Sequence, residues 1–295
     1  MEVRTRQIER SAVTALLPVA ALVPFWLLAM AIIWIPIHLV TGIPFWVVPV
    51  AWVLLGAMLF VPPVQIEVLS RLFGARRPYD DELAIIAPIW RDLAARANLP
   101  RHRYAIRVID SDDLNAFACG GHLLIVTSFA LEQLTQRELS GVLAHELSHH
   151  LGWHTAALTV GHWLSLPVIV LARFGFFLQN VARAATDSFA SHSAALTALG
   201  RVVAAVLTAV SWVFLAALYA SDALSNIVGH GSEYEADRRA VRMGYGRDLA
   251  DALRVVIQLG GGARTIGWRA RLAASHPPAR TRVARIEAMM RHPSR

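Results

Sequence analysis

The stretch His145-Glu146-Leu147-Ser148-His149 combines the residue types and the spacing that a catalytic zinc site requires. On a helix, His145 and His149 lie on one face about 40° apart, so both imidazoles can reach one tetrahedral Zn²⁺. Glu146 projects beside them, where its carboxylate can accept a proton from a metal-activated water that attacks a carbonyl. The motif predicts one Zn²⁺ per chain, with His145 and His149 as ligands and Glu146 as general base.

The residues before this motif predict the helix that must carry it. Thr135 has the character of an N-cap, and Glu138 three residues later completes a capping box. A polar surface helix with incidental histidines is the alternative, but the composition would produce only about 0.016 copies of such a motif by chance. We therefore interpret residues 145–149 as a functional motif on a helix.

A third zinc ligand is sought among the acidic residues of the segment from Ser232 to Ala240. Glu233 and Asp237 are four residues apart and share a helical face, so one can bind zinc while the other hydrogen-bonds a ligand histidine. Glu235 points elsewhere and is expected to be solvated. We read this segment as the acidic start of a helix, although acidic residues there often only complement the helix dipole.

The composition predicts a membrane protein. Hydrophobic residues make up 56% of the chain, charged residues only 17%, and the mean hydropathy is +0.47. Apolar runs over Ser11–Val40 and Ile43–Val64 can each span a bilayer, which takes about 20 helical residues. The runs Thr155–Ala172 and Val202–Ala220 are near the lower limit, and a buried or partly inserted hairpin is their alternative.

Between the apolar runs the chain has a mixed, soluble composition. A helix is expected over Asp80–Asn98, and strands over Arg103–Ile109 and His122–Thr127. The predicted fold is a mainly α integral membrane protein, with about four transmembrane helices and a gluzincin-like α+β zinc-protease domain containing a small β-sheet. Four domains are expected: a transmembrane hairpin (1–66), a soluble part with the zinc motif (67–154), a second membrane hairpin (155–221) and a helical C-terminal part (222–295).

The net charge of +7 indicates a lipid bilayer as partner and argues against nucleic acid. All 28 basic residues are arginines, and they are scattered around apolar runs rather than gathered on a basic helix with aromatic residues. Arginines before the first run and after the second place both flanks in the cytoplasm. We therefore expect a multi-pass protein of the cell membrane whose active site faces the cytoplasm. Its single cysteine, Cys119, is expected to be a small buried residue.

These motifs, in this order, resemble the HtpX and CAAX prenyl protease family of membrane metallopeptidases. The resemblance rests on residues 145–149, on Ser232–Asp237, on Asn115-Ala116-Phe117-Ala118 and on Ser275-His276-Pro277-Pro278 followed by Arg285-Ile286. The length and the four predicted spans are closer to the HtpX type. The family often has an arginine shortly before its third-ligand glutamate, where this chain has Gly229-His230-Gly231.

The resemblance implies a role for each matching residue. His145, His149 and Glu233 become the zinc ligands, Glu146 the general base, and Asp237 the residue that orients a ligand. Asn115 and His276 are implied to position the substrate or to stabilise the oxyanion. His150, His154 and His162 are expected to lie away from the zinc.

The expected substrates are polypeptides, bound as an added strand along the edge of His122–Thr127. The family implies a role in the quality control of misfolded or membrane proteins. Processing of prenylated proteins and a non-catalytic metal-binding scaffold are the alternatives, and a scaffold would not need Glu146. An intramembrane zinc protease is disfavoured, because the helix with the motif contains Arg137 and Glu138.

Overall fold

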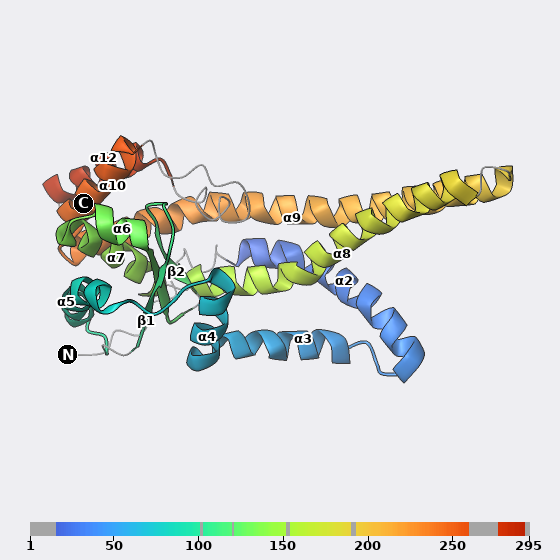
Figure 1. Ribbon diagram of the computed structural model, residues 1–295, viewed down its shortest axis with the longest axis horizontal. Helices are drawn as coiled ribbons and strands as arrows, with labels where there is room; N and C mark the ends of the chain where they lie inside the picture. The colour runs from blue at the N-terminus through green and yellow to red at the C-terminus, as the bar shows by residue number, and fades with distance from the viewer. Residues whose placement is uncertain are drawn as a thin grey trace. The chain divides into compact units, whose positions relative to one another are not determined.

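The computed structural model describes residues 16–100, 103–119, 121–151, 154–189, 193–259 and 277–292, which form two compact units. Residues 16–56 and 160–225 form what we call the span unit. Residues 57–159 and 226–292 form what we call the sheet unit. The chain passes between the units after Gly56 and again within the long helices α8 (His154–Phe189) and α9 (Ala194–Arg242), which Figure 1 labels. The domain boundaries expected from the sequence stay a prediction.

Three helices of the described chain are long and apolar enough to cross a membrane. They are α2 (Leu17–Thr41), the Thr159–Ser188 part of α8 and the Ala194–Asp222 part of α9. In the span unit, α2 packs against α8 and α9 through a buried cluster that includes Trp26, Val168 and Phe214. The mainly α membrane fold predicted from the sequence is therefore confirmed.

The second predicted span, Ile43–Val64, is wrong as one continuous helix. Helix α3 ends at Ala57 (Val47–Ala57), a 3-10 turn covers Met58–Phe60, and α4 begins at Pro62 (Pro62–Phe73). Val61 between them is extended, with φ −76° and ψ 115°. Pro62 has no N–H, and its ring disfavours a helical conformation at the preceding residue, so the helix cannot continue. The two helical segments form a pair bent by 91°, which counts as a fourth span only if it is one broken span.

The sheet unit contains a mixed three-stranded sheet in the order β1-β3-β2. Its strands are β1 (Ala105–Ile109), β2 (Ala116–Cys119) and β3 (Leu123–Thr127). The central strand β3 runs parallel to β1 and antiparallel to β2. Both predicted strands are confirmed, but β3 has a neighbour on each side and offers no edge to a substrate. Both β1 and β2 are outer strands of the described sheet, and an isolated bridge joins Val108 of β1 to Arg76.

Helices cover both faces of this sheet. Alternate residues of β3 point to opposite faces: Leu123 and Ile125 contact α4, while Leu124 and Val126 belong to the main core. That core also includes buried residues of α5 (Asp80–Arg96), α6 (Ser128–Gln133), α7 (Gln136–Leu151), α10 (Gly246–Gln258) and α12 (Ala279–Arg291). The 145–149 motif lies on α7 and is therefore held from the sheet side and from the C-terminal helices.

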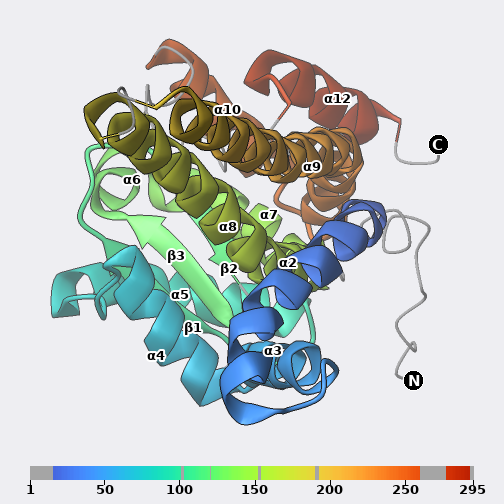
Figure 2. The same cartoon turned by 90° about the vertical axis from the view of Figure 1, so that its right-hand side faces the viewer.

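Helix α9 continues without a break from the span unit into the sheet unit. It runs for 49 residues, beside α8 for much of its length (Figures 1 and 2). The prediction that a new helix starts at Ser232 is therefore wrong. A glycine lowers the stability of a helix by only about 1 kcal/mol relative to alanine. The packing of a long helix outweighs the cost of Gly229 and Gly231. Consequently the acidic residues expected in a first helical turn lie in the last turns of a helix that starts in the span unit.

Candidate metal centre

Helix α7 begins with the predicted capping box. The backbone N–H of Thr135 donates to Glu138 (2.8 Å), and the backbone N–H of Glu138 donates to the Thr135 hydroxyl (3.3 Å). This arrangement satisfies two backbone donors that a helix start otherwise leaves unpaired. The helix is then buried from Leu139 to His150 apart from the partly buried Val142, so the histidines of the motif face the protein interior rather than solvent.

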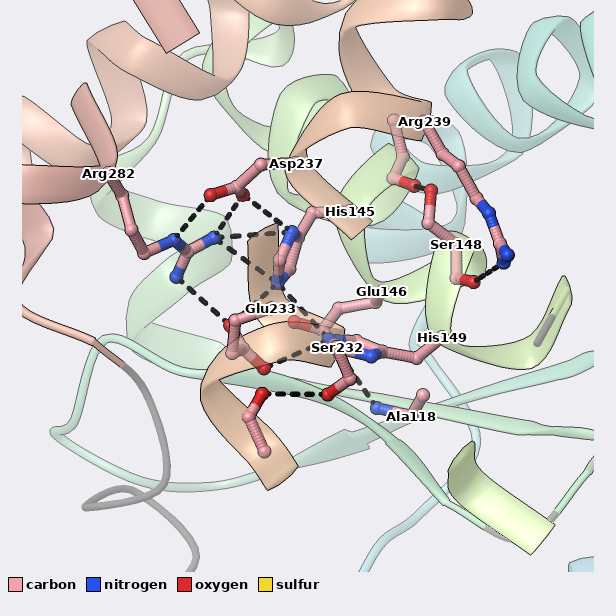
Figure 3. A network of polar contacts seen from close by, with 12 residues as sticks. Ala118, His145, Glu146, Ser148, His149, Ser232, Glu233, Asp237, Arg239 and Arg282 are labelled. Carbon is pink, nitrogen blue, oxygen red and sulfur yellow. Dashed lines mark hydrogen bonds and ion pairs between the residues drawn. The ribbon is translucent and has the colours of Figure 1, made fainter. Parts of the chain in front are cut away.

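His145 and His149 point their Nε2 atoms at the same place as Glu233 of α9 (Figure 3). The two Nε2 atoms are 3.2 Å apart, and carboxylate oxygens of Glu233 lie 3.3 Å from His145 Nε2 and 3.2 Å from His149 Nε2. All three side chains are buried. Of the described acidic and histidine residues, these three form the group that could hold a metal ion.

The separation of the two imidazole nitrogens fits a tetrahedral Zn²⁺. With bonds of about 2.0–2.1 Å, the ligand atoms of such an ion are about 3.3 Å apart. Two imidazole nitrogens and a carboxylate are also the donor set that zinc accepts in catalytic sites, where a fourth position stays open. The residues present therefore fit the group that the sequence predicts.

Asp237, one helical turn after Glu233, holds the other side of His145. Its Oδ1 lies 3.0 Å from His145 Nδ1, and the side chain is fully buried. Burial acts to raise the pKa of Asp237, but the hydrogen bonds from His145 and from Arg282 outweigh it and lower the pKa to about 2. Asp237 is thus a stable anion that fixes the orientation of the His145 ring.

Arg282 of α12 completes this group and was not identified from the sequence. Its guanidinium donates two hydrogen bonds to Asp237, at 3.0 and 2.7 Å, and lies 3.5 Å from Glu233 (Figure 3). The sequence pointed instead to Arg285, which is exposed and stacks on the Tyr234 ring at 3.9 Å. Three arginines follow Pro278 within seven residues, and only the packing of α12 shows which one turns inward.

The Glu146 carboxylate is hydrogen-bonded to the outer strand β2. The backbone N–H of Ala118 in β2 donates to its carboxylate at 2.9 Å, and Glu146 is only 5% exposed. A buried carboxylate with one donor retains an oxygen for proton transfer. The base candidate therefore lies directly beside β2, an outer strand of the described sheet.

The comparisons with known proteins agree with this geometry. A family model described as "Peptidase family M48" matches residues 83–290. The chain belongs to peptidase family M48. Members of this family are metallopeptidases, so the resemblance drawn from the sequence is confirmed. The crystal structure of S. mikatae Ste24p is similar to this M48 chain in fold, with a TM-score of 0.53 and 17% identity. That match covers 87% of this chain and 61% of the Ste24p chain.

The roles that the resemblance implies for Asn115 and His276 stay predictions. Asn115 directly precedes β2, and its backbone pairs with Thr127: its carbonyl accepts from the Thr127 N–H at 3.0 Å. Asn115 is thus next to the strand that contacts Glu146, and its side chain makes no hydrogen bond to the three donor residues in the described chain. His276 lies outside the described residues, so its role stays a prediction.

His150 anchors α7 to the sheet. Its Nε2 lies 3.0 Å from the Leu123 carbonyl oxygen, and its ring is 4.9 Å from that of Tyr104. Burial lowers the pKa of His150 to about 3, so the ring is neutral and its Nε2–H donates to the carbonyl. A second anchor is Arg239, which donates to the Ser148 carbonyl at 3.0 Å. This position agrees with the expectation that His150 lies away from the metal ligands. The His150 ring instead links α7 to β3 through its hydrogen bond to Leu123.

Proposed function

We propose that this M48 chain is a membrane-bound zinc endopeptidase in which His145, His149 and Glu233 hold one Zn²⁺. The observation that carries the proposal is the convergence of His145, His149 and Glu233. The two Nε2 atoms are 3.2 Å apart, one Glu233 oxygen lies 3.3 Å from His145 Nε2, and the other lies 3.2 Å from His149 Nε2. A second buried glutamate, Glu146, lies in the next position of α7 after His145. When bound, the ion would supply a Lewis acid that polarises the scissile carbonyl and lowers the pKa of a water. A structural zinc site would be closed by four protein ligands, whereas three leave a position for chemistry.

Glu146 supplies the proton transfers. Its carboxylate accepts a proton from the attacking water and returns it to the amine that leaves. Ala118 holds one side of this carboxylate through its N–H, which fixes the direction in which Glu146 reaches. Because the group is buried, the transfer takes place away from bulk water, where charge interactions are stronger.

Asp237 and Arg282 keep the ligand set in place. Asp237 accepts from the Nδ1 side of His145, which leaves the Nε2 side of that ring for the metal. Arg282 binds Asp237 through two parallel hydrogen bonds and so ties α12 to α9. A single positive guanidinium thus balances part of the negative charge that two buried carboxylates bring to the site.

The substrate chain is proposed to pair with β2, in place of the strand expected from the sequence. In an antiparallel ladder, alternate residues turn their N–H and C=O groups away from the neighbouring strand. The pairing of Asn115 with Thr127 sets this alternation, so Ala116 and Ala118 face away from β3. Ala118 accordingly reaches Glu146. An extended peptide bound to Ala116 would pass directly in front of the base with little dependence on its side chains.

We further propose the cell membrane as the location, with the site facing the cytoplasm and misfolded or membrane proteins as substrates. The candidate spans support the membrane. The arginines Arg71, Arg76 and Arg77 after α3 support the orientation. Family resemblance supports the substrate class, and processing of prenylated peptides is the competing activity.

The first prediction tests this function on the purified full-length protein in detergent. Wild type should bind one zinc, hydrolyse casein and lose this activity with a chelator. Glu146→Gln should keep the zinc but lose about 10²–10⁴-fold in rate, since only the base is removed. Near-normal hydrolysis by zinc-loaded Glu146→Gln would refute the mechanism. Faster cleavage of a farnesylated peptide than of an unfolded membrane protein would favour prenyl-protein processing.

A further inference from the structure

One charged residue lies in the middle of an otherwise apolar part of α8. Arg173 is the only charged residue from Val160 to Ala182, and the part of α9 from Val202 to Ser221 has none. Its side chain is exposed and makes no hydrogen bond or ion pair with any residue in the described ranges. By contrast Arg183, ten residues later, lies beside the Gln179 side chain, whose amide oxygen accepts from Arg183 at 2.7 Å once the amide is assigned in the orientation that its neighbours favour.

Two close contacts fix how α8 and α9 lie against each other. Gly175 faces Ser211, and Thr186 faces Gly200, with no room for a Cβ at either glycine. This antiparallel register places Arg173 level with Val213 of α9.

The same register shows how deep Arg173 lies. Asp222 is level with Leu164 and bounds the apolar band at one end, while Arg183 and Arg201 bound it at the other. The band is about 19 residues long in α8, or about 29 Å at 1.5 Å per residue, which matches the bilayer core of about 30 Å. Arg173 is therefore about 14 Å from either end. A long charged side chain near a helix end extends to the interface, whereas a charge at the centre of a span is costly.

The surroundings of Arg173 form an outward-facing helix surface. Leu166, Val170 and Phe177 lie on the same face of α8, with exposed fractions of 43%, 60% and 59%. With Arg173 they follow the 4-3-4 spacing of residues that meet a second helix. The opposite face of α8, which includes Val168 and Ala172, packs in the buried cluster of the span unit. The Arg173 surface is thus unpartnered within the described chain.

The described helices supply no acidic partner at this depth. Residues 16–66, which include α2 and α3, contain no charged residue at all, and the same holds in a second copy. Lipid phosphates lie outside the hydrocarbon core, more than about 15 Å from the bilayer centre. Ionisable residues inside membranes pair with one another or with backbone carbonyls. We propose that the Arg173 surface binds a transmembrane helix of another protein that has a carboxylate near its middle.

The test measures binding without hydrolysis. Full-length protein in lipid nanodiscs is treated with a chelator, so that the result does not depend on the proposed activity. Leucine-alanine peptides of one span carry Glu, Gln or Leu at the central position, and fluorescence energy transfer reports their binding at pH 8. Wild type should bind the Glu peptide at least about 10-fold more tightly than the Leu peptide, which corresponds to the strength of a charge-assisted hydrogen bond.

Two variants and a control decide the assignment. Arg173→Leu should bind the Glu and Leu peptides equally, while Arg183→Leu should keep the preference. Arg173→Glu should instead prefer a peptide with a central Lys, which shows pairing rather than a change of fold. Equal binding of all peptides to wild type would overturn the proposal. So would a preference for Glu that survives Arg173→Leu, or one that Arg183→Leu abolishes.

Discussion

The two units bury apolar surface in different ways. In the sheet unit, Leu139, Leu143 and Leu147 are fully enclosed by protein. In the span unit, Leu39, Val40 and Leu54 are 79%, 86% and 64% exposed, although they are equally apolar. The sheet unit gains its hydrophobic stabilisation by packing, whereas the span unit obtains it only if lipid covers its surface.

Charged residues show the same contrast. In the sheet unit the buried Arg282 forms ion pairs with Asp237 and Glu233. These three buried charges are therefore compensated by one another. In the span unit Arg173 faces outward without such a partner in the described residues. Within the described residues, the sheet unit pairs Arg282 with two carboxylates of its own, whereas the span unit presents Arg173 on its outer face. This difference is the basis of the proposed helix partner.

The largest effect on stability is expected from Arg282. Arg282→Leu leaves the buried Asp237 carboxylate without two hydrogen bonds, and breaking a buried pair in this way costs about 3–5 kcal/mol. Arg285→Leu is the matched control on the same helix and should cost less than about 1 kcal/mol, because Arg285 is exposed. Chemical unfolding in detergent micelles measures both, and equal losses would show that the charge network is not buried.

A second pair of variants compares the units directly. Leu28 in the middle of α2 and Leu83 in α5 are nearly equally exposed, at 46% and 48%. Leu28→Lys should raise the free energy of inserting α2 by about 3 kcal/mol, since a charge at a span centre costs about 2.5–3.5 kcal/mol. Leu83→Lys should change the stability by less than about 0.5 kcal/mol. A glycosylation-reporter insertion assay tests the first variant, and thermal unfolding tests the second. If Leu28→Lys left the free energy of insertion unchanged, α2 would not be surrounded by lipid at Leu28.

The smallest expected effect concerns two glycines. A Cβ at Gly141 of α7 would collide with the backbone of Asp248 and Leu249 in α10, whereas Gly231 of α9 has open space around it. Gly141→Ala should therefore cost about 1–3 kcal/mol through overpacking. Gly231→Ala should stabilise by about 0.5–1 kcal/mol, as alanine favours a helix. Chemical unfolding gives both values. If Gly141→Ala raised the stability of the protein, α7 and α10 would be further apart than the structure places them.

Local signals explain what the sequence could predict. The capping box at Thr135 and the regular pattern of α5 both predicted helices that the structure contains. His145 and His149 are one turn apart on a single helix, so the helix alone brings their side chains together, whatever it packs against. Such features need no knowledge of the tertiary fold.

The sequence did not predict β2, the helix break at Val61 or the role of Arg282. Two of these features depend on contacts between distant segments, and the helix break was overlooked in an apolar run. The residues of β2 are alanine, phenylalanine and cysteine without alternating polarity, and β2 is a strand because it pairs with β3. The break at Val61 follows from Pro62, a signal that the apolar composition concealed. Arg282 could not be chosen among neighbouring arginines, since its burial depends on where α12 packs.

The most direct test of the metal centre is the zinc content of three purified variants. Glu233 and Asp237 share a face of α9, and Glu235 lies about 200° around the helix from Glu233. Glu235 instead pairs with Arg238 at 2.7 Å. We expect Glu233→Ala to lose most of the bound zinc, Asp237→Ala to lose about 10 to 100-fold in affinity and Glu235→Ala to remain like wild type. A full zinc complement in Glu233→Ala, or an empty site in Glu235→Ala alone, would contradict the account.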